Sequence, residues 1–241
     1  MSRLGAVRFA QYAYPPNALG YCGPPGARAM LAPDATDEIE RRARQFEGAW
    51  AYLEVLAEVA RVTDPLAVEV VDAYWVGGDL LDELEPAALV RRLVDRFRGQ
   101  PGGTWREAAT RATAHHAFQV FEVYPWAALL RAGRPPAPAV RVLDRCRVRV
   151  GEVLAVTGET ATVTSRPLTW DGRHLVEGPA LVEQARWSQD GGSLIDVPVV
   201  GDTVALHWDW VCEVLSADRA AGVVARERGQ LEALGLSPGG R

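Results

Sequence analysis

Apolar residues in the N-terminal half recur at the spacing of amphipathic helices. Asp37-Glu-Ile-Glu40 has the pattern of a capping box, and apolar residues follow it at every third or fourth position to about Val62. Asp64-Pro65 is typical of a helix start, and Gly77-Gly78 of its end. Pro86 opens another predicted helix.

A second capping-box pattern predicts the longest helix. Thr104-Trp-Arg-Glu107 follows a break at Gly99–Gly103 and starts a helix to about Ala132, with a kink at Pro125. Four helices joined by short breaks predict a helical bundle-like domain. The stretch Arg8–Gly26 before them is rich in aromatic residues, and its Pro-Pro pairs and glycines predict a loop.

The pattern changes to a period of two in the C-terminal half. Arginine and valine alternate over Arg147–Val150, which is typical of a half-buried strand with Cys146 at its entrance. Turn signals follow at Thr157–Thr160, Asp171-Gly172 and Asp190–Gly192. Several short strands at this spacing predict a small closed barrel.

These elements predict an α+β fold in two domains, and 241 residues are enough for two separate cores. Arg134-Pro-Pro-Ala-Pro-Ala139 is expected to be an extended, semi-rigid linker. Ser216 is a suitable cap for a last helix. The predicted parts are a helical domain (1–133), a linker (134–139), a barrel with a C-terminal helix (140–236) and a tail (237–241).

Composition narrows the function classes. Hydrophobic content of 48% and charged content of 24% are typical of a soluble globular protein. We find no run of about 18 apolar residues and no signal-peptide core, so we expect a cytoplasmic protein that does not contact the membrane. All 26 basic residues are arginine, which excludes lysine chemistry, and the net charge of −5 argues against a nucleic-acid partner.

The predicted long helix carries candidate polar ligands. His115, Gln119 and Glu122 would share one helix face, with His116 about 100° around the axis. Such a set could coordinate a cation or move protons, although its spacing matches no common metal motif. Cys22, in the aromatic N-terminal segment, is a further candidate. The alternative interpretation is that the histidines are ordinary core or surface residues.

The C-terminal half also carries short motifs in a fixed order. They are Cys146, Gly151-Glu-Val-Leu154, Gly158-Glu-Thr-Ala-Thr-Val163, Gly201-Asp-Thr-Val-Ala-Leu-His207 and a helix from Ser216. In this order, over about residues 145–235, they resemble the HypC-type chaperones of [NiFe]-hydrogenase maturation. The resemblance implies an OB-like barrel with a C-terminal helix. The chain departs from the family in the internal position of its cysteine, in lacking a proline soon after it, and in Trp208-Asp-Trp-Val-Cys212 where the family has Gly-Phe-Ala.

The resemblance implies a function for two residues. Cys146 matches the family cysteine that holds iron carrying cyanide and carbon monoxide ligands, and His207 matches the family histidine. It implies a non-enzymatic maturation chaperone whose partners are the [NiFe]-hydrogenase large-subunit precursor and a HypD-like scaffold protein. A soft thiolate and an imidazole suit low-spin iron. The N-terminal half is similar to an uncharacterised actinobacterial family found near hydrogenase genes.

Two alternatives to the chaperone stay open. The helical domain could be a metal-dependent enzyme that makes or handles a diatomic ligand, with His115, His116, Glu122 and Cys22 around one cavity. In the other alternative, the barrel is an OB-type interaction module that binds no metal, and Cys146 is a small buried apolar residue.

Overall fold

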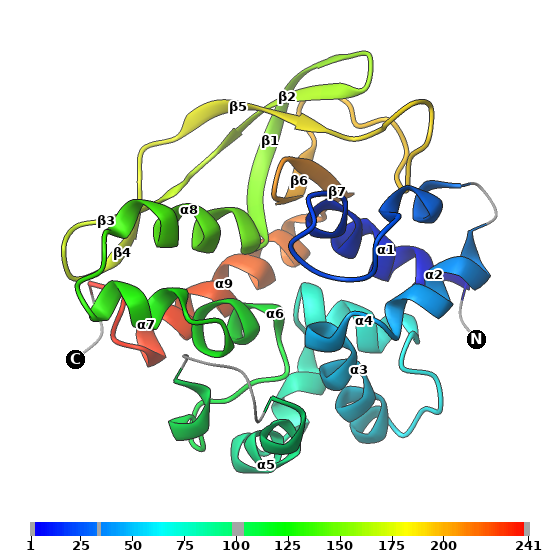
Figure 1. The fold of residues 1–241 in the computed structure, drawn as a ribbon. Coiled ribbons are helices and arrows are strands. Elements are labelled where there is room, and N and C mark those ends of the chain that lie inside the picture. The colour runs from blue at the N-terminus through cyan, green and yellow to red at the C-terminus, as the bar shows by residue number, and fades with distance from the viewer. Residues whose placement is uncertain (1–2, 33–34, 98–103, 239–241) are drawn as a thin grey trace.

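The computed structural model describes residues 3–32, 35–97 and 104–238 (Figure 1). The predicted break at Gly99–Gly103 and the last residues of the predicted tail lie outside these ranges. The α-helices are α1 (Arg3–Ala18), α2 (Thr36–Ala43), α3 (Glu47–Ala60), α4 (Val68–Trp75), α5 (Pro86–Arg96), α6 (His116–Phe118), α7 (Trp126–Arg131), α8 (Pro136–Cys146) and α9 (Ala217–Ala233). Shorter helical turns are η1 (Ala27–Leu31), η2 (Asp79–Glu83), η3 (Trp105–Glu107) and η4 (Gln119–Val123), and the last of these is π-helical. The strands are β1 (Arg149–Thr157), β2 (Thr160–Ser165), β3 (Leu168–Trp170), β4 (Leu175–Glu177), β5 (Leu181–Arg186), β6 (Thr203–His207) and β7 (Trp210–Val214).

The predicted α+β class and the closed barrel are confirmed. Five strands close in the order β1-β2-β5-β7-β6, with antiparallel neighbours except for a parallel contact between β5 and β7. The register of β1 against β2 shifts between Val153 and Ala155. Gly151 of β1 has no room for a side chain, because a Cβ there would lie 2.7 Å from the Thr164 carbonyl oxygen. Helix α9 follows the barrel, and Ser216 caps it by accepting a hydrogen bond from the Arg219 amide.

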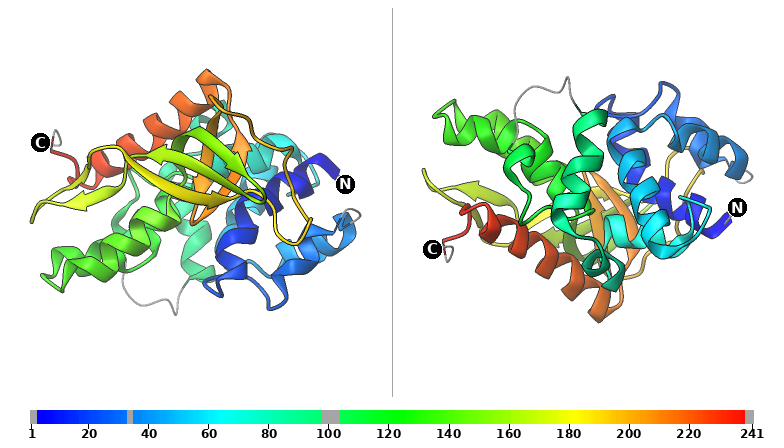
Figure 2. Two further views of the ribbon diagram at one scale, coloured as in Figure 1. Left: turned by 90° about the horizontal axis from the view of Figure 1, so that it is seen from above. Right: turned by 90° about the horizontal axis from the view of Figure 1, so that it is seen from below.

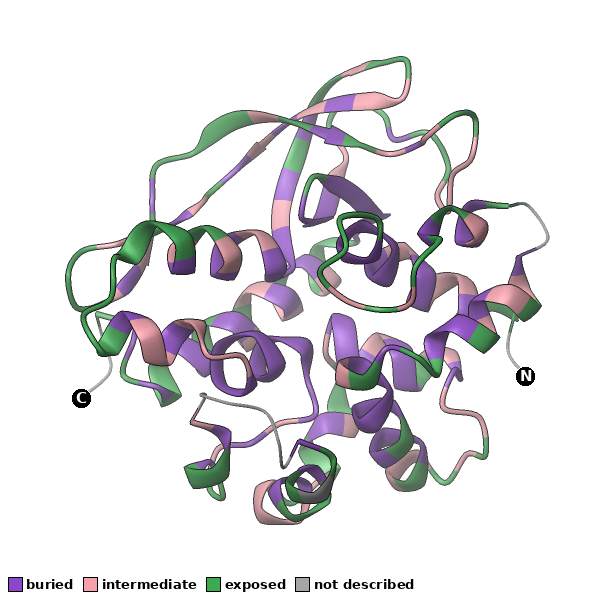
Figure 3. Ribbon diagram, in the orientation of Figure 1, coloured by how far each residue is buried: buried purple, intermediate pink, exposed green. Residues whose placement is uncertain are grey.

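Helices cover the side of the barrel formed by β6 and β7, as the views from above and from below show (Figure 2). One hydrophobic cluster runs from Phe9 and Trp75 in the helices to Ala205 and Trp210 in the strands. The buried segments of α1, α4 and α6 therefore face buried strand residues (Figure 3). The two predicted domains share this cluster, and the boundary near residue 134 stays a prediction. In the part of the chain that the structure describes, no helix is long and apolar enough to cross a bilayer.

The predicted N-terminal loop is wrong for the stretch up to Ala18, which is the end of helix α1. Pro15 and Pro16 lie in its last turn. Because proline has no amide hydrogen, Pro16 leaves the carbonyl of Tyr12 without its helical donor. That carbonyl accepts a hydrogen bond from His207 Nδ1 instead, at 2.7 Å. The aromatic residues of α1 are buried, and this burial stabilises a helix that its prolines disfavour.

The predicted helix from Asp37 to Val62 is two helices. The chain breaks between α2 and α3 at Phe46, whose ring packs edge-on against Phe9 with centroids 5.2 Å apart. This burial of a large ring in the core outweighs the continuous helical pattern.

The predicted long helix from Thr104 to Ala132 is also broken, into η3, α6, η4 and α7. His115 has an extended backbone, and its Nδ1 accepts a hydrogen bond from the Ala117 amide at 3.0 Å, so a new helix starts there. Before Pro125 the backbone is extended again, since proline disfavours a helical residue ahead of it.

The predicted extended linker is helical over most of its length. Pro136 is the first residue of α8, and residues 136–139 form its first turn. Proline suits this position because the first amides of a helix have no intrahelical acceptor. Helix α8 ends at Cys146, directly before β1.

A charged cluster joins α1 to the barrel. Glu213 of β7 accepts a hydrogen bond from the Tyr12 hydroxyl at 2.6 Å and one from Arg219 at 3.1 Å, and it pairs with Arg8. Burial alone would raise the pKa of Glu213, but the hydrogen bonds from Tyr12 and Arg8 and the contact with Arg219 lower it.

Glu213→Gln should lower the free energy of unfolding by about 2 kcal/mol at pH 7, because it removes charged hydrogen bonds from a buried site. The lowered pKa means that this stabilisation is complete above the unfolded pKa of about 4.3 and is lost as the pH falls through the folded pKa. Urea unfolding between pH 7 and pH 4 measures the difference. The exposed Glu152→Gln is the control. An equal loss in both variants would contradict the assigned role of Glu213.

Candidate metal centre

Three buried donors converge where the helices meet the barrel. His116 begins α6, Cys146 ends α8 and His207 ends β6. One ligand atom from each lies within 4.8 Å of the other two. The structure therefore brings together Cys146 and His207, which the sequence predicted as a pair, and adds His116, one of the weaker candidates.

His207 presents a free lone pair. Its Nδ1–H donates to the Tyr12 carbonyl at 2.7 Å, so Nε2 of the neutral ring carries the lone pair. His207 is 0% exposed, and Nε2 has no hydrogen-bond partner among the described residues. Burial lowers the pKa of His207 to about 4, although the backbone oxygens of Tyr12 and Cys146 near its ring oppose this. A buried, unpaired nitrogen is costly, and a metal ion would satisfy it.

His116 is oriented by the end of helix α8. Its Nε2 lies 2.7 Å from the Cys146 carbonyl oxygen, which can only accept, so Nε2 carries the hydrogen and Nδ1 the lone pair. The Tyr74 hydroxyl lies 3.3 Å from Nδ1. Burial, followed by the neighbouring His207, lowers the pKa of His116. Both imidazoles are therefore neutral at pH 7, which is the form that binds metals.

The sulfur of Cys146 completes the set, which we call the triad (His116, Cys146 and His207). The residue is 8% exposed, and burial raises the pKa of its thiol. The thiol is therefore protonated in the metal-free protein, and a metal ion would displace that proton on binding.

The triad borders a cavity of about 200 Å³. Its wall is rich in aromatic residues: Tyr21, Phe46, Tyr74, Trp75, Tyr124, Trp126 and Trp208. Cys22 lies in the same wall. Larger hollows of up to about 610 Å³ lie elsewhere on the described surface, and the triad lines none of them. The three candidate ligands therefore border a small, largely apolar space.

Trp208 closes one side of the cavity in a strained conformation. Its φ of 56° lies in the left-handed region, which costs a residue other than glycine about 1–2 kcal/mol. Two backbone hydrogen bonds hold it, one from its amide to the Arg145 carbonyl at 2.8 Å and one from Arg149 Nη2 to its own carbonyl at 2.6 Å. Its ring stacks on Tyr21, with centroids 4.0 Å apart.

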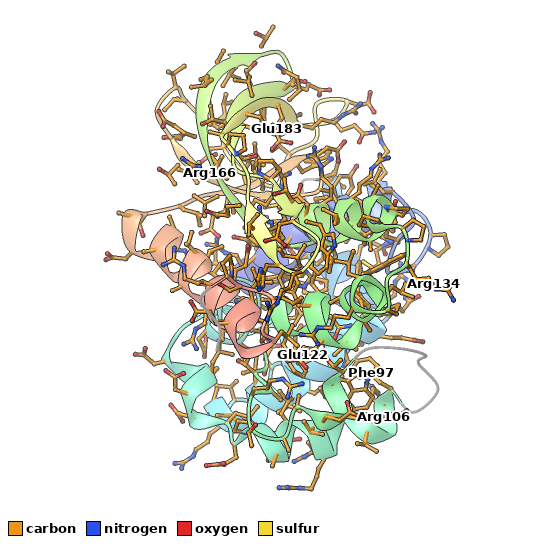
Figure 4. All side chains as sticks on the ribbon, turned by 90° about the vertical axis from the view of Figure 1, so that its left-hand side faces the viewer. Phe97, Arg106, Glu122, Arg134, Arg166 and Glu183 are labelled. Atoms are coloured by element: carbon orange, nitrogen blue, oxygen red, sulfur yellow. The ribbon has the colours of Figure 1, made fainter. Side chains whose placement is uncertain are left out.

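The structure places the other two candidate ligands elsewhere. Glu122 is fully buried, but it accepts hydrogen bonds from Arg111 at 2.9 Å, Thr104 at 2.9 Å and Gln230 at 2.8 Å. Figure 4 shows it among the helices, far from Glu183 on the barrel. His115 caps α6 and does not line the cavity. Burial and Arg226 lower the pKa of His115 to about 3.

The donor set determines which ions fit. One thiolate and two neutral imidazoles suit zinc, iron, cobalt or copper, whereas magnesium and calcium prefer oxygen donors. Such ions lie about 2.0–2.3 Å from nitrogen and sulfur donors, so only a small contraction of the triad is needed. Three protein ligands leave a coordination position open, as in catalytic or transfer sites.

Sequence reasoning missed the residues that support the triad. Trp75 lies 4.4 Å from the His116 ring and 5.6 Å from the His207 ring, between centroids. Tyr74 and the Tyr12 carbonyl contact the imidazole nitrogens. The sequence did contain a signal for Tyr12. In any helix that includes both residues, the proline four positions later leaves the Tyr12 carbonyl without its amide donor.

The family model for a family of unknown function (DUF6390) matches residues 1–237. The chain therefore belongs to that family. No curated protein and no solved structure matches the chain.

The cysteines should differ in reactivity. Cys22 is partly exposed, whereas Cys146 is 8% and Cys212 1% exposed. We expect iodoacetamide to modify Cys22 first in the folded, metal-free protein, because access of the reagent limits the other two. Timed alkylation followed by peptide mass spectrometry measures the order, and urea-unfolded protein is the control. Modification of Cys146 as fast as Cys22 would show that the triad is open to solvent.

Proposed function

We propose that this member of the DUF6390 family binds iron at the triad and acts as an accessory protein in hydrogenase maturation. The observation that carries the proposal is the convergence of Cys146 and His207, the two residues of the HypC-type resemblance, on a third buried donor. His116 adds a second neutral imidazole, and only a long hydrogen bond, from the Tyr74 hydroxyl at 3.3 Å, occupies its Nδ1.

The barrel supports the proposal. Five strands with mostly antiparallel neighbours, one parallel closure and a helix after the last strand are what we expect of an OB-like barrel of the HypC type. We therefore assign the barrel to the OB-like class.

The triad suits iron as cargo. Iron that cyanide and carbon monoxide make low-spin suits a soft thiolate donor, and an imidazole can add to its coordination. An incomplete set of protein ligands leaves room for such ligands and makes release possible. In this reading a HypD-like scaffold protein and the hydrogenase large-subunit precursor are the partners between which the iron passes.

A second candidate is a metal-dependent enzyme. The helical part supplies His116, and the cavity of about 200 Å³ beside the triad could hold a small molecule. The original enzyme hypothesis placed His115 and Glu122 at the same cavity. Because both lie elsewhere, the enzyme would have to use the triad itself.

We expect anaerobically prepared protein to bind one Fe²⁺ per chain. Replacing any triad residue by alanine should weaken binding more than 100-fold, because loss of even an outer partner of a metal site typically costs about 10- to 100-fold. Competition with a chromophoric chelator measures the affinity. His174→Ala, which removes a histidine on the Asp171 turn, is the control. Unchanged affinity in all three triad variants would end the metal proposal.

The protein purified from an anaerobic, reducing lysate of its own host should carry infrared bands of cyanide and carbon monoxide. It should also retain a hydrogenase large subunit or a scaffold protein. Cys146→Ala should lose the bands and the hydrogenase activation while keeping the wild-type circular dichroism spectrum. Iron without these bands, together with no hydrogenase defect in the variant, would favour the enzyme over the chaperone.

A further inference from the structure

The segment from Leu19 to Gly26, which we call the strap, is held firmly over the cavity. The buried side chain of Asn17 donates to the Cys22 carbonyl at 2.8 Å and to the Pro24 carbonyl at 2.7 Å. Arg42 donates to the Pro25 carbonyl at 2.9 Å. These hydrogen bonds fix the course of the strap backbone beside the triad.

Aromatic contacts fix the strap from the other side. Tyr21 is 58% exposed, yet its ring stacks on Trp208, the residue that follows the triad histidine. Gly23 lies against Phe46, and a Cβ at this position would be 2.5 Å from the ring. The residue between them is Cys22, so both contacts direct this position towards the cavity.

The thiol of Cys22 has no role in holding the strap. The hydrogen bonds from Asn17 use backbone oxygens, and no hydrogen bond to the sulfur is found within the described ranges. Burial raises the pKa of the Cys22 thiol to about 12. Cys22 lines the cavity with all three triad residues, although its sulfur is not one of the atoms that lie within 4.8 Å of one another. It is a soft donor held close to an incomplete site.

The strap can bring this donor closer. Gly20 and Gly23 on either side have φ values of 76° and 77°, and nothing lies within 4 Å of a Cβ built on Gly20. Glycine changes backbone conformation at little steric cost, so a small rotation at these positions, together with a change of the Cys22 rotamer, would move the sulfur while the hydrogen bonds from Asn17 stay in place. His207 Nε2, buried without a partner, independently marks the same cavity as a ligand site.

We propose that Cys22 is a displaceable fourth ligand, which closes on an ion held by the triad and moves away when the ion is released. This inference rests on the proposed metal function. It converts the centre into a set of two thiolates and two imidazoles, with one thiolate and one imidazole from each side of the junction. Release then requires only that the Cys22 sulfur moves away, and the triad stays in place.

Cobalt(II) tests the inference, because the intensity of its sulfur-to-cobalt absorption follows the number of bound thiolates. We expect Cys22→Ala to bind one Co²⁺ with about half the wild-type charge-transfer intensity, whereas Cys212→Ala keeps the full intensity. Cys212 is the matched control because it is buried and does not line the cavity. In a chelator challenge, Cys22→Ala should release Co²⁺ at least 10-fold faster than the wild type.

Wild-type intensity and release rate in Cys22→Ala would overturn the fourth ligand and leave the triad proposal standing. If the wild-type protein itself bound no Co²⁺ and no Fe²⁺, the proposed function would fail, and this inference with it. Circular dichroism of both alanine variants separates loss of a ligand from loss of the fold.

Discussion

The candidate centre depends on the hydrogen bond between the Tyr12 carbonyl and His207 Nδ1. This bond exists because Pro16, one turn later in α1, cannot donate to that carbonyl. A carbonyl can only accept, so it fixes the tautomer of His207 and leaves Nε2 with its lone pair. A backbone feature of the first helix thus determines the chemical state of a side chain almost 200 residues later.

A backbone carbonyl also fixes the tautomer of His116. Its hydrogen goes to the Cys146 carbonyl, which is among the last four of helix α8 and has no partner inside the helix. One candidate ligand therefore orients another through its backbone carbonyl. The arrangement leaves His207 Nε2 buried without a partner, and such an atom costs about 1–3 kcal/mol unless something satisfies it. This cost, at the junction of two structural parts, is one reason for our proposal that the triad holds an ion.

The sequence predicted the barrel better than the helices, for a physical reason. Strand alternation and turn residues act over a few positions, so the barrel followed from local patterns. The helical part depends on distant contacts: Phe46 breaks a helix to reach Phe9, and the prolines of α1 are tolerated because its aromatic residues are buried. For the centre, ordered motifs indicated Cys146 and His207. Helical periodicity could not choose between the two adjacent histidines, because the predicted long helix does not form.

The departures of this chain from the HypC-type pattern fit the same arrangement. Where that family has a glycine after its histidine, this chain has Trp208, in a left-handed backbone that a glycine would adopt without strain. Hydrogen bonds to Arg145 and from Arg149 hold this conformation, and the ring meets Tyr21 of the N-terminal part. The stacking contact of the strained Trp208 with Tyr21 therefore requires the N-terminal helical part. The internal position of the cysteine fits this arrangement as well. The Cys146 carbonyl lies at the end of helix α8, where it accepts the hydrogen bond that orients His116.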